Sequence, residues 1–381
     1  MSLIILLFAL DSISNYQSCP DFESYWDFYA GNRISSQACG MGYTGVASTG
    51  DISSTFINPA SLSLENKKQI YFEYVYKNDI DRAYDIKYKN LNPNFSLGFG
   101  LPINDYFQTG ITYRTEKSKK TDYGEIYGTM VSDTAESGFI NTGLLDVYKN
   151  VKISSFSIPI IFKLKDILSV GIDLSYTNFY SKTRLGEITH TDTLTDSTWT
   201  VPYIVTANFN KIRPNFGIIV SPLENLSLGL TYLPETKENV SIELTDTAIT
   251  YAEPNIFPLN IGIGISYRFN TIPLSLSLDY KYSRNSVEEN LVNRKDIHFG
   301  LEYDIKENLK LRTGFFTQKS YTSRAIQLES YWENHDQIFT TFGISYKINS
   351  LALNLSLMDS HLFSSGSVEQ TYFNTGISYG F

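Results

Sequence analysis

Side chains that could do acid–base or metal chemistry are sparse in this sequence. Only four histidines occur, and none has a second ligand at the spacing of a metal site: His190, His298, His335 and His361. Glu333, His335 and Asp336 have the residue types of a hydrolase centre, but a cluster in a solvated loop is the better interpretation. No Gly-Lys-Ser or Gly-Lys-Thr phosphate motif occurs. We therefore expect no enzyme, no metal and no cofactor.

The cysteine count and the net charge narrow the class of protein further. Cys19 and Cys39 are too few for a disulfide framework, and they either pair with each other or stay reduced. The net charge of −9 and the lack of a basic patch argue against nucleic acid as a partner. Aromatic residues make up 14% of the chain and charged residues 19%, a balance that favours strands over helices.

The first residues have the pattern of an export signal. The apolar run 3–10 has the length of a secretory hydrophobic core and is too short to span a bilayer as a helix. We expect residues 1–18 to form a signal peptide, with a cleavage point within about 12–18. No other segment approaches 18 consecutive apolar residues, so the sequence excludes a helical membrane protein.

Apolar and polar residues alternate with period two, which places them on opposite faces of strands. In 168–176, apolar residues at even positions oppose Ser169, Gly171, Asp173 and Ser175, and 259–269, 274–280 and 351–357 show the same split. Lipid would contact the apolar set. The other set would line a lumen, where charges such as Asp173, Asp279 and Lys281 either select solutes or are simply hydrated.

The spacing of these strands predicts an all-β, transmembrane antiparallel barrel of about fourteen strands. We expect strands at 69–77, 93–101, 106–115, 151–163, 168–181, 211–221, 226–234, 257–269, 273–283, 296–305, 309–318, 337–348, 351–360 and 371–381. Short links alternate with longer ones at 116–150, 182–210, 235–256, 284–295, 319–336 and 361–370. Outer-membrane barrels have this asymmetry, with short periplasmic turns, long outer loops and both termini in the periplasm.

A repeated Gly-x-x-Tyr-x-apolar pattern precedes the short links and predicts an aromatic girdle at one membrane interface. The fourth copy, Gly376, Tyr379 and Phe381, ends the sequence. It resembles the C-terminal signal by which barrel-assembly machinery recognises bacterial outer-membrane barrels, so that machinery is an expected partner.

The region 19–66 does not alternate, and we expect it to form a hatch or plug inside a barrel of residues 67–381. It contains Gly40, Gly42, Gly45 and Asp51, followed by Asn58, Pro59 and Ala60. This stretch resembles the FadL/TodX and PorV/PorQ outer-membrane superfamily, whose N-terminal region has a Gly-Met-Gly opening and an Asn-Pro-Ala motif. The resemblance implies a fourteen-stranded barrel closed by an N-terminal hatch. An ordinary turn is the alternative for Asn-Pro-Ala.

Two functions follow from the resemblance. The first is FadL-like transport of hydrophobic or amphipathic small molecules across the outer membrane, past a hatch near Asn58. The second is a PorV-like role in type IX secretion, in which the barrel binds or shuttles secreted cargo proteins. Both put the chain in outer-membrane lipid, and neither identifies the substrate or cargo.

Overall fold

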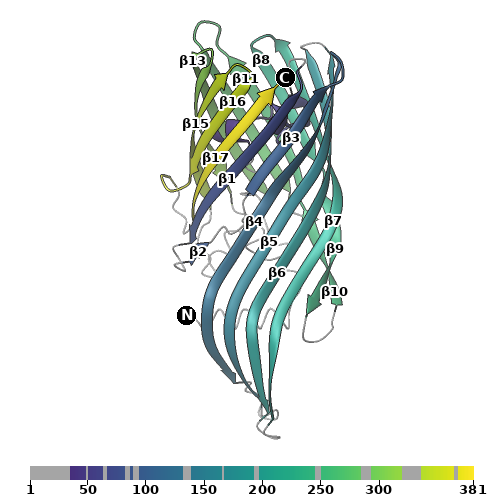
Figure 1. The fold of residues 1–381 in the computed structure, drawn as a ribbon, viewed down its shortest axis with the longest axis vertical. Helices are drawn as coiled ribbons and strands as arrows, with labels where there is room; N and C mark the ends of the chain where they lie inside the picture. The colour runs from purple at the N-terminus through teal and green to yellow at the C-terminus, as the bar shows by residue number, and fades with distance from the viewer. Residues whose placement is uncertain are drawn as a thin grey trace.

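A computed structural model gives the fold of the chain (Figure 1). The structure describes residues 35–48, 50–62, 67–81, 86–88, 94–131, 139–164, 167–192, 197–244, 250–284, 293–319, 336–363 and 368–381. The expected signal peptide, Cys19 and the Glu333–His335 pair lie outside these ranges.

The strands form one closed antiparallel barrel whose wall has fourteen strand positions, as the sequence predicts. β1 pairs with β17 from Gln69↔Gly380 to Asp81↔Val368, which closes the wall. The structure has seventeen labelled strands because three of these positions are each occupied by two strands in succession: β3 with β2, β8 with β9, and β11 with β10. The strands are β1 Gln69–Asp81, β2 Ile86–Tyr88, β3 Asn94–Pro102, β4 Phe107–Val131, β5 Phe139–Leu164, β6 Leu168–Asp192, β7 Ser197–Leu223, β8 Leu226–Leu233, β9 Thr236–Leu244, β10 Thr250–Phe257, β11 Leu259–Arg268, β12 Leu274–Arg284, β13 Arg294–Lys306, β14 Leu309–Gln318, β15 Gln337–Ile348, β16 Leu351–Asp359 and β17 Val368–Gly380.

The two faces of the wall carry the residues that the alternation predicts. On β6, Leu174 and Tyr176 are exposed on the outside, whereas Asp173 and Ser175 are buried on the inside. β12 and β16 repeat this split, with Leu278 and Leu355 outside and Asp279 and Asn354 inside. The outer surface is therefore apolar and the inner surface is polar, which is the arrangement of a barrel in lipid.

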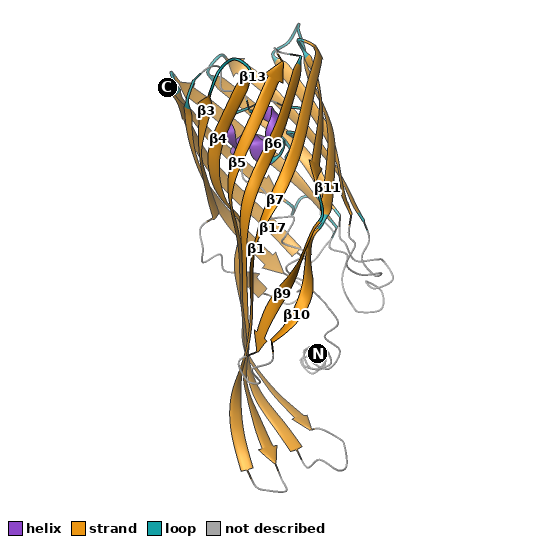
Figure 2. Ribbon diagram, turned by 90° about the vertical axis from the view of Figure 1, so that its right-hand side faces the viewer, coloured by secondary structure: helices purple, strands orange, loops and turns teal. Residues whose placement is uncertain are grey.

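Three of the predicted long links are wrong, because the structure has strands there. β4, β5, β6 and β7 run through most of 116–150 and 182–210, and β9 and β10 form a hairpin within 235–256. Figure 2 shows these strands projecting beyond the rest of the barrel. Beyond the wall a strand need not divide its side chains between lipid and lumen, so hydropathy is a poorer guide to strands here.

The short turns gather at the opposite end of the barrel from this projection (Figure 1). They include 224–225, 307–308 and 349–350, and the C-terminus lies at the same end. Three short helical elements lie inside the barrel, in the half nearest these turns (Figure 2): α3 Ser36–Gly40, η1 Ile52–Phe56 and η2 Pro59–Ser61. Among the described residues, no helix combines the length and apolar character needed to cross a bilayer.

Candidate functional site

The described residues 35–48 and 50–62 form an inner segment inside the wall, and polar side chains shape each of its helical elements. The Ser35 hydroxyl accepts a hydrogen bond from the Ala38 N–H at 3.4 Å and caps α3. Asp51 caps η1 by accepting from the Ser53 N–H at 2.9 Å. Asn58 caps η2 by accepting from the Ala60 N–H at 2.9 Å, and Pro59 fits the first helical position.

Glycines of the wall let the inner segment approach the strands closely. A side chain at Gly171 would overlap Pro59, one at Gly217 would overlap Asn58, and one at Gly300 would overlap Met41. The lack of a side chain at these three wall glycines therefore leaves space that the inner segment occupies. On the segment itself, Gly42 has φ +63°, a conformation that side chains disfavour.

Lumen-facing side chains of β12 and β13 hold one bend of the segment by its backbone. Asp279 Oδ2 accepts from the Gly45 N–H at 2.8 Å and the Val46 N–H at 3.1 Å. Lys281 Nζ donates to the Tyr43 carbonyl at 2.9 Å, and His298 Nδ1 donates to the Gly42 carbonyl at 2.9 Å. Each backbone group meets a side chain of the complementary kind, so these buried polar groups are satisfied.

A second set of contacts fixes the start of the segment to β1, β15 and β17. The Glu73 carboxylate accepts from the Ser35 N–H at 2.9 Å and the Ser36 N–H at 2.7 Å. Thr341 Oγ1 accepts from the Gly42 N–H at 2.9 Å and donates to the Gly40 carbonyl at 3.1 Å. Cys39 is buried, and its Sγ lies 2.9 Å from Asn374 Nδ2.

All seven residues predicted for the hatch motif lie on the inner segment, in two separate regions. Gly40, Gly42 and Gly45 lie in the bend held by β12–β15, and Asn58, Pro59 and Ala60 lie against β6 and β7. Asn58 Nδ2 links the two parts by donating to the Val46 carbonyl at 2.5 Å, and Asp51 contacts α3, where Gln37 Nε2 donates to its carboxylate at 3.0 Å. Burial raises the pKa of Asp51, and its hydrogen bonds with Ser53 oppose that shift.

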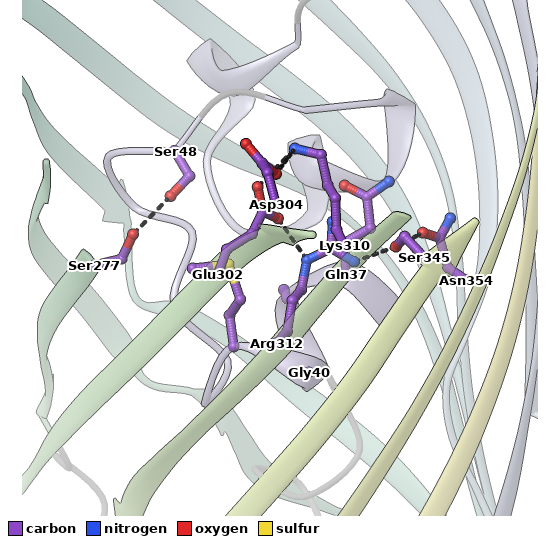
Figure 3. A network of polar contacts seen from close by, with 12 residues as sticks. Gln37, Gly40, Ser48, Ser277, Glu302, Asp304, Lys310, Arg312, Ser345 and Asn354 are labelled. Atoms are coloured by element: carbon purple, nitrogen blue, oxygen red, sulfur yellow. Dashed lines mark hydrogen bonds and ion pairs between the residues drawn. The ribbon is translucent and has the colours of Figure 1, made fainter. Parts of the chain in front are cut away.

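A network of charged and polar residues lines β13–β16 beside the start of the segment (Figure 3). Glu302 accepts from Lys310 Nζ and Arg312 Nε, both at 2.7 Å. Arg312 continues the network through Ser345 to Asn354, and Gln37 of the segment lies beside it (Figure 3). Away from this network, the hydroxyl of Ser48 on the segment lies 3.4 Å from that of Ser277 on β12 (Figure 3).

The lumen face of β5–β7 is layered along the barrel. Nearest the short turns, Ile161, Gly171 and Gly217 contact the inner segment. Further along these strands and the neighbouring β4 comes a polar layer that includes Glu116 of β4, Asp173 and Arg213. Beyond it lies a cluster of buried apolar side chains, which we call the apolar cluster: Val151, Ile153, Phe179, Phe209 and Phe257.

Sequence reasoning missed the role of the lumen charges. Asp173 and Asp279 are each 1% exposed, so they are buried rather than hydrated. Period-two parity was enough to place them on the inner face. No pattern showed that Asp279 would bind backbone 233 and 234 residues away in the sequence. Within the described ranges, no group of His, Cys, Asp and Glu could hold a metal ion.

The predicted C-terminal signal lies at the seam of the barrel. Tyr379 and Phe381 are exposed on the outer face, with ring centroids 6.0 Å apart. The Phe381 N–H donates to the Lys68 carbonyl at 2.9 Å, and Gly376 faces inward beside Ser36 and Glu73. Recognition of these residues by assembly machinery stays a prediction.

A closed antiparallel barrel with an apolar outer face and a polar inner face is a transmembrane β-barrel. The fold is similar to that of a FadL homologue from Pseudomonas aeruginosa, with TM-score 0.64 and 13% identity over 90% of this chain and 97% of the other.

Two aromatic-hydrocarbon transporters share the fold. The toluene transporter TbuX of Ralstonia pickettii has TM-score 0.61 and 15% identity over 92% of this chain and 99% of its own. The toluene transporter TodX of Pseudomonas putida has TM-score 0.58 and 13% identity over 90% and 96%. At such identities the likeness concerns the fold, and at that level it confirms the predicted FadL/TodX resemblance. No protein-family model and no curated protein matches the chain.

Proposed function

We propose that this protein conducts hydrophobic or amphipathic small molecules across the outer membrane, with the inner segment as the hatch. The apolar cluster carries the proposal, because a lumen that served only water and ions would have no use for Phe179, Phe209 and Phe257 on its inner face. The similar folds of a FadL homologue and two toluene transporters support it.

The route passes Asn58, Pro59 and Ala60. On this side the segment packs against glycines of the wall and makes few hydrogen bonds with it. Ser169 Oγ donates to the Ala60 carbonyl at 2.7 Å, and Asn58 Nδ2 donates to the Ile218 carbonyl at 3.5 Å. The bend at 40–46 is held more strongly, by Asp279, Lys281, His298 and Thr341. Local opening follows the weaker set of contacts.

In this proposal the short-turn end faces the periplasm. The C-terminus lies at that end, and β1 begins beside it, since Gln69 pairs with Gly380. The projecting strands β4–β7 then face the outside of the cell, as long connections of outer-membrane barrels do.

Uptake of an apolar fluorescent probe by cells that express the protein tests the passage. We expect faster uptake than in cells without it, and a further increase of about fivefold in Ser169→Ala, because a net hydrogen bond of about 1 kcal/mol no longer holds the closed segment. The matched control is Ser266→Ala, whose hydroxyl lies 3.1 Å from Ser277 and outside this contact. Uptake no faster than in cells without the protein would refute the proposal.

The projecting sheet supports a second candidate, a PorV-like platform for secreted proteins. β4–β7 extend beyond the other wall strands, and their projecting parts offer a binding surface outside the wall (Figure 1). If this is the function, cargo co-purifies with the intact barrel and is lost when the projection is shortened, while probe uptake is unchanged.

A further inference from the structure

The polar layer of the lumen lies between the inner segment and the apolar cluster. On its inner side, the Arg114 guanidinium covers the ring of Phe56 in η1 at 5.0 Å. On its outer side, the Arg213 guanidinium covers the ring of Phe257 in the apolar cluster at 4.1 Å. The two arginines therefore line the β4–β7 side of the lumen between the apolar cluster and the inner segment.

Glu116 joins both arginines. Its Oε1 lies 3.0 Å from Arg114 Nη2, and its Oε2 lies 3.3 Å from Arg213 Nη1. Ser155 Oγ donates to Oε1 at 2.6 Å, which fixes the carboxylate. Glu116 and Arg213 are 3% and 5% exposed, so water screens the pair little.

The layer holds two carboxyl groups beside its two guanidinium groups. Asp173 on β6 is the second carboxyl group, it is buried, and Arg114 favours its ionised form. A ligand carboxylate in this layer would lose its hydration and face Glu116 and Asp173 as well as the arginines. A hydroxyl or another uncharged polar group needs no counter-charge and finds both donors and acceptors here.

We propose that Glu116 is a specificity residue, which makes the lumen accept uncharged apolar or amphipathic molecules and reject their anionic counterparts. This inference rests on the proposed function and narrows its substrate class. By pairing with both Arg114 and Arg213, Glu116 occupies the donors and lowers the positive charge that a fatty-acid carboxylate would require. The layer then passes alcohols, phenols and hydrocarbons.

A pair of ligands with the same chain length tests this role. Binding of dodecanol and of laurate to the purified full-length protein is measured by displacement of a fluorescent apolar probe at pH 7.5. We expect the wild type to bind dodecanol more tightly than laurate. Glu116→Gln leaves a net positive layer, and we expect it to shift the affinity ratio toward laurate by roughly tenfold.

Two further variants separate the role of charge from loss of structure. Glu116→Gln combined with Arg213→Gln has the net charge of the wild type again, and we expect it to restore the wild-type ratio. Glu302→Gln makes the same change beside Arg312 and Lys310 on β13–β14, away from the polar layer, and should leave the ratio unchanged. Far-UV circular dichroism establishes that each variant is folded.

The outcomes divide clearly. Equal binding of laurate and dodecanol by the wild type, or the same ratio in folded Glu116→Gln and wild type, refutes the role of Glu116 and leaves the transport proposal standing. Binding of neither ligand by the wild type refutes both. If Glu116→Gln does not fold, the wild-type preference and the double variant decide.

Discussion

At the scale of single residues, the lumen side chains bind the backbone of the inner segment instead of water. One carboxylate oxygen of Asp279 accepts hydrogen bonds from two backbone N–H groups, and the two carboxylate oxygens of Glu73 accept one each. Hydrogen bonds to a buried carboxylate are stronger than neutral ones, and they are costly to lose. A few wall residues therefore define the position of a segment that has only short helical elements of its own.

Asp279→Asn should loosen the bend at Gly45 and Val46. The amide offers one neutral acceptor in place of a carboxylate, so we expect local opening to become easier by about 1–2 kcal/mol. Hydrogen–deuterium exchange of residues 43–48 should accelerate roughly tenfold. Asp296→Asn is the matched control, because Asp296 binds Arg294 and the Lys319 N–H instead of the segment. Equal exchange in the two variants would contradict the assignment.

At the scale of elements, the long strands β4–β7 serve two different settings. The parts of these strands that lie nearest the short turns alternate and form the wall, as the pairing of Thr112 with Ser157 on the inner face illustrates. Their outer parts continue the same ladders beyond the wall, from Thr121↔Lys149 to Val131↔Ile140 in the β4–β5 hairpin. The same four strands thus form both the wall and the part that projects beyond it.

Shortening the projection should leave the barrel intact. We expect a variant in which an Asn-Gly turn replaces residues 122–148 to fold, because the wall pairs from Phe107↔Phe162 to Thr115↔Ser154 remain. Circular dichroism and resistance to protease measure folding. An equal reduction that removes these wall pairs should abolish it, and failure of the first variant would show that the projection is needed for closure.

At the scale of the whole molecule, the apolar outer face requires a lipid environment. Ile263 and Ile348 are 56% and 47% exposed, but Ile263 lies in the middle of β11 and Ile348 ends β15 beside a short turn. In a bilayer Ile263→Arg should cost about 2–4 kcal/mol and Ile348→Arg about 0–1 kcal/mol. Urea unfolding from lipid vesicles measures both. Equal costs would mean that Ile263 does not lie at membrane depth.

The sequence alone determined the closed wall. Alternation in segments such as 168–176 and 259–269 fixes which side chains face lipid, because a strand has only two faces and a bilayer accepts apolar groups on one of them. The same rule did not find the outer parts of β4–β7, since they project beyond the wall, where no bilayer distinguishes the two faces of a strand.

The tertiary structure alone decided the interior. Gly40, Gly42, Gly45 and the Asn58–Ala60 turn were recognisable as a motif, but their partners Thr341, Asp279 and Ser169 lie on strands far away in the sequence. The joining of Arg114, Glu116 and Arg213 likewise depends on barrel closure and on a bulge between Thr115 and Lys117. Hydropathy assigns a residue to a face, whereas contacts across a lumen depend on the register of every strand between them.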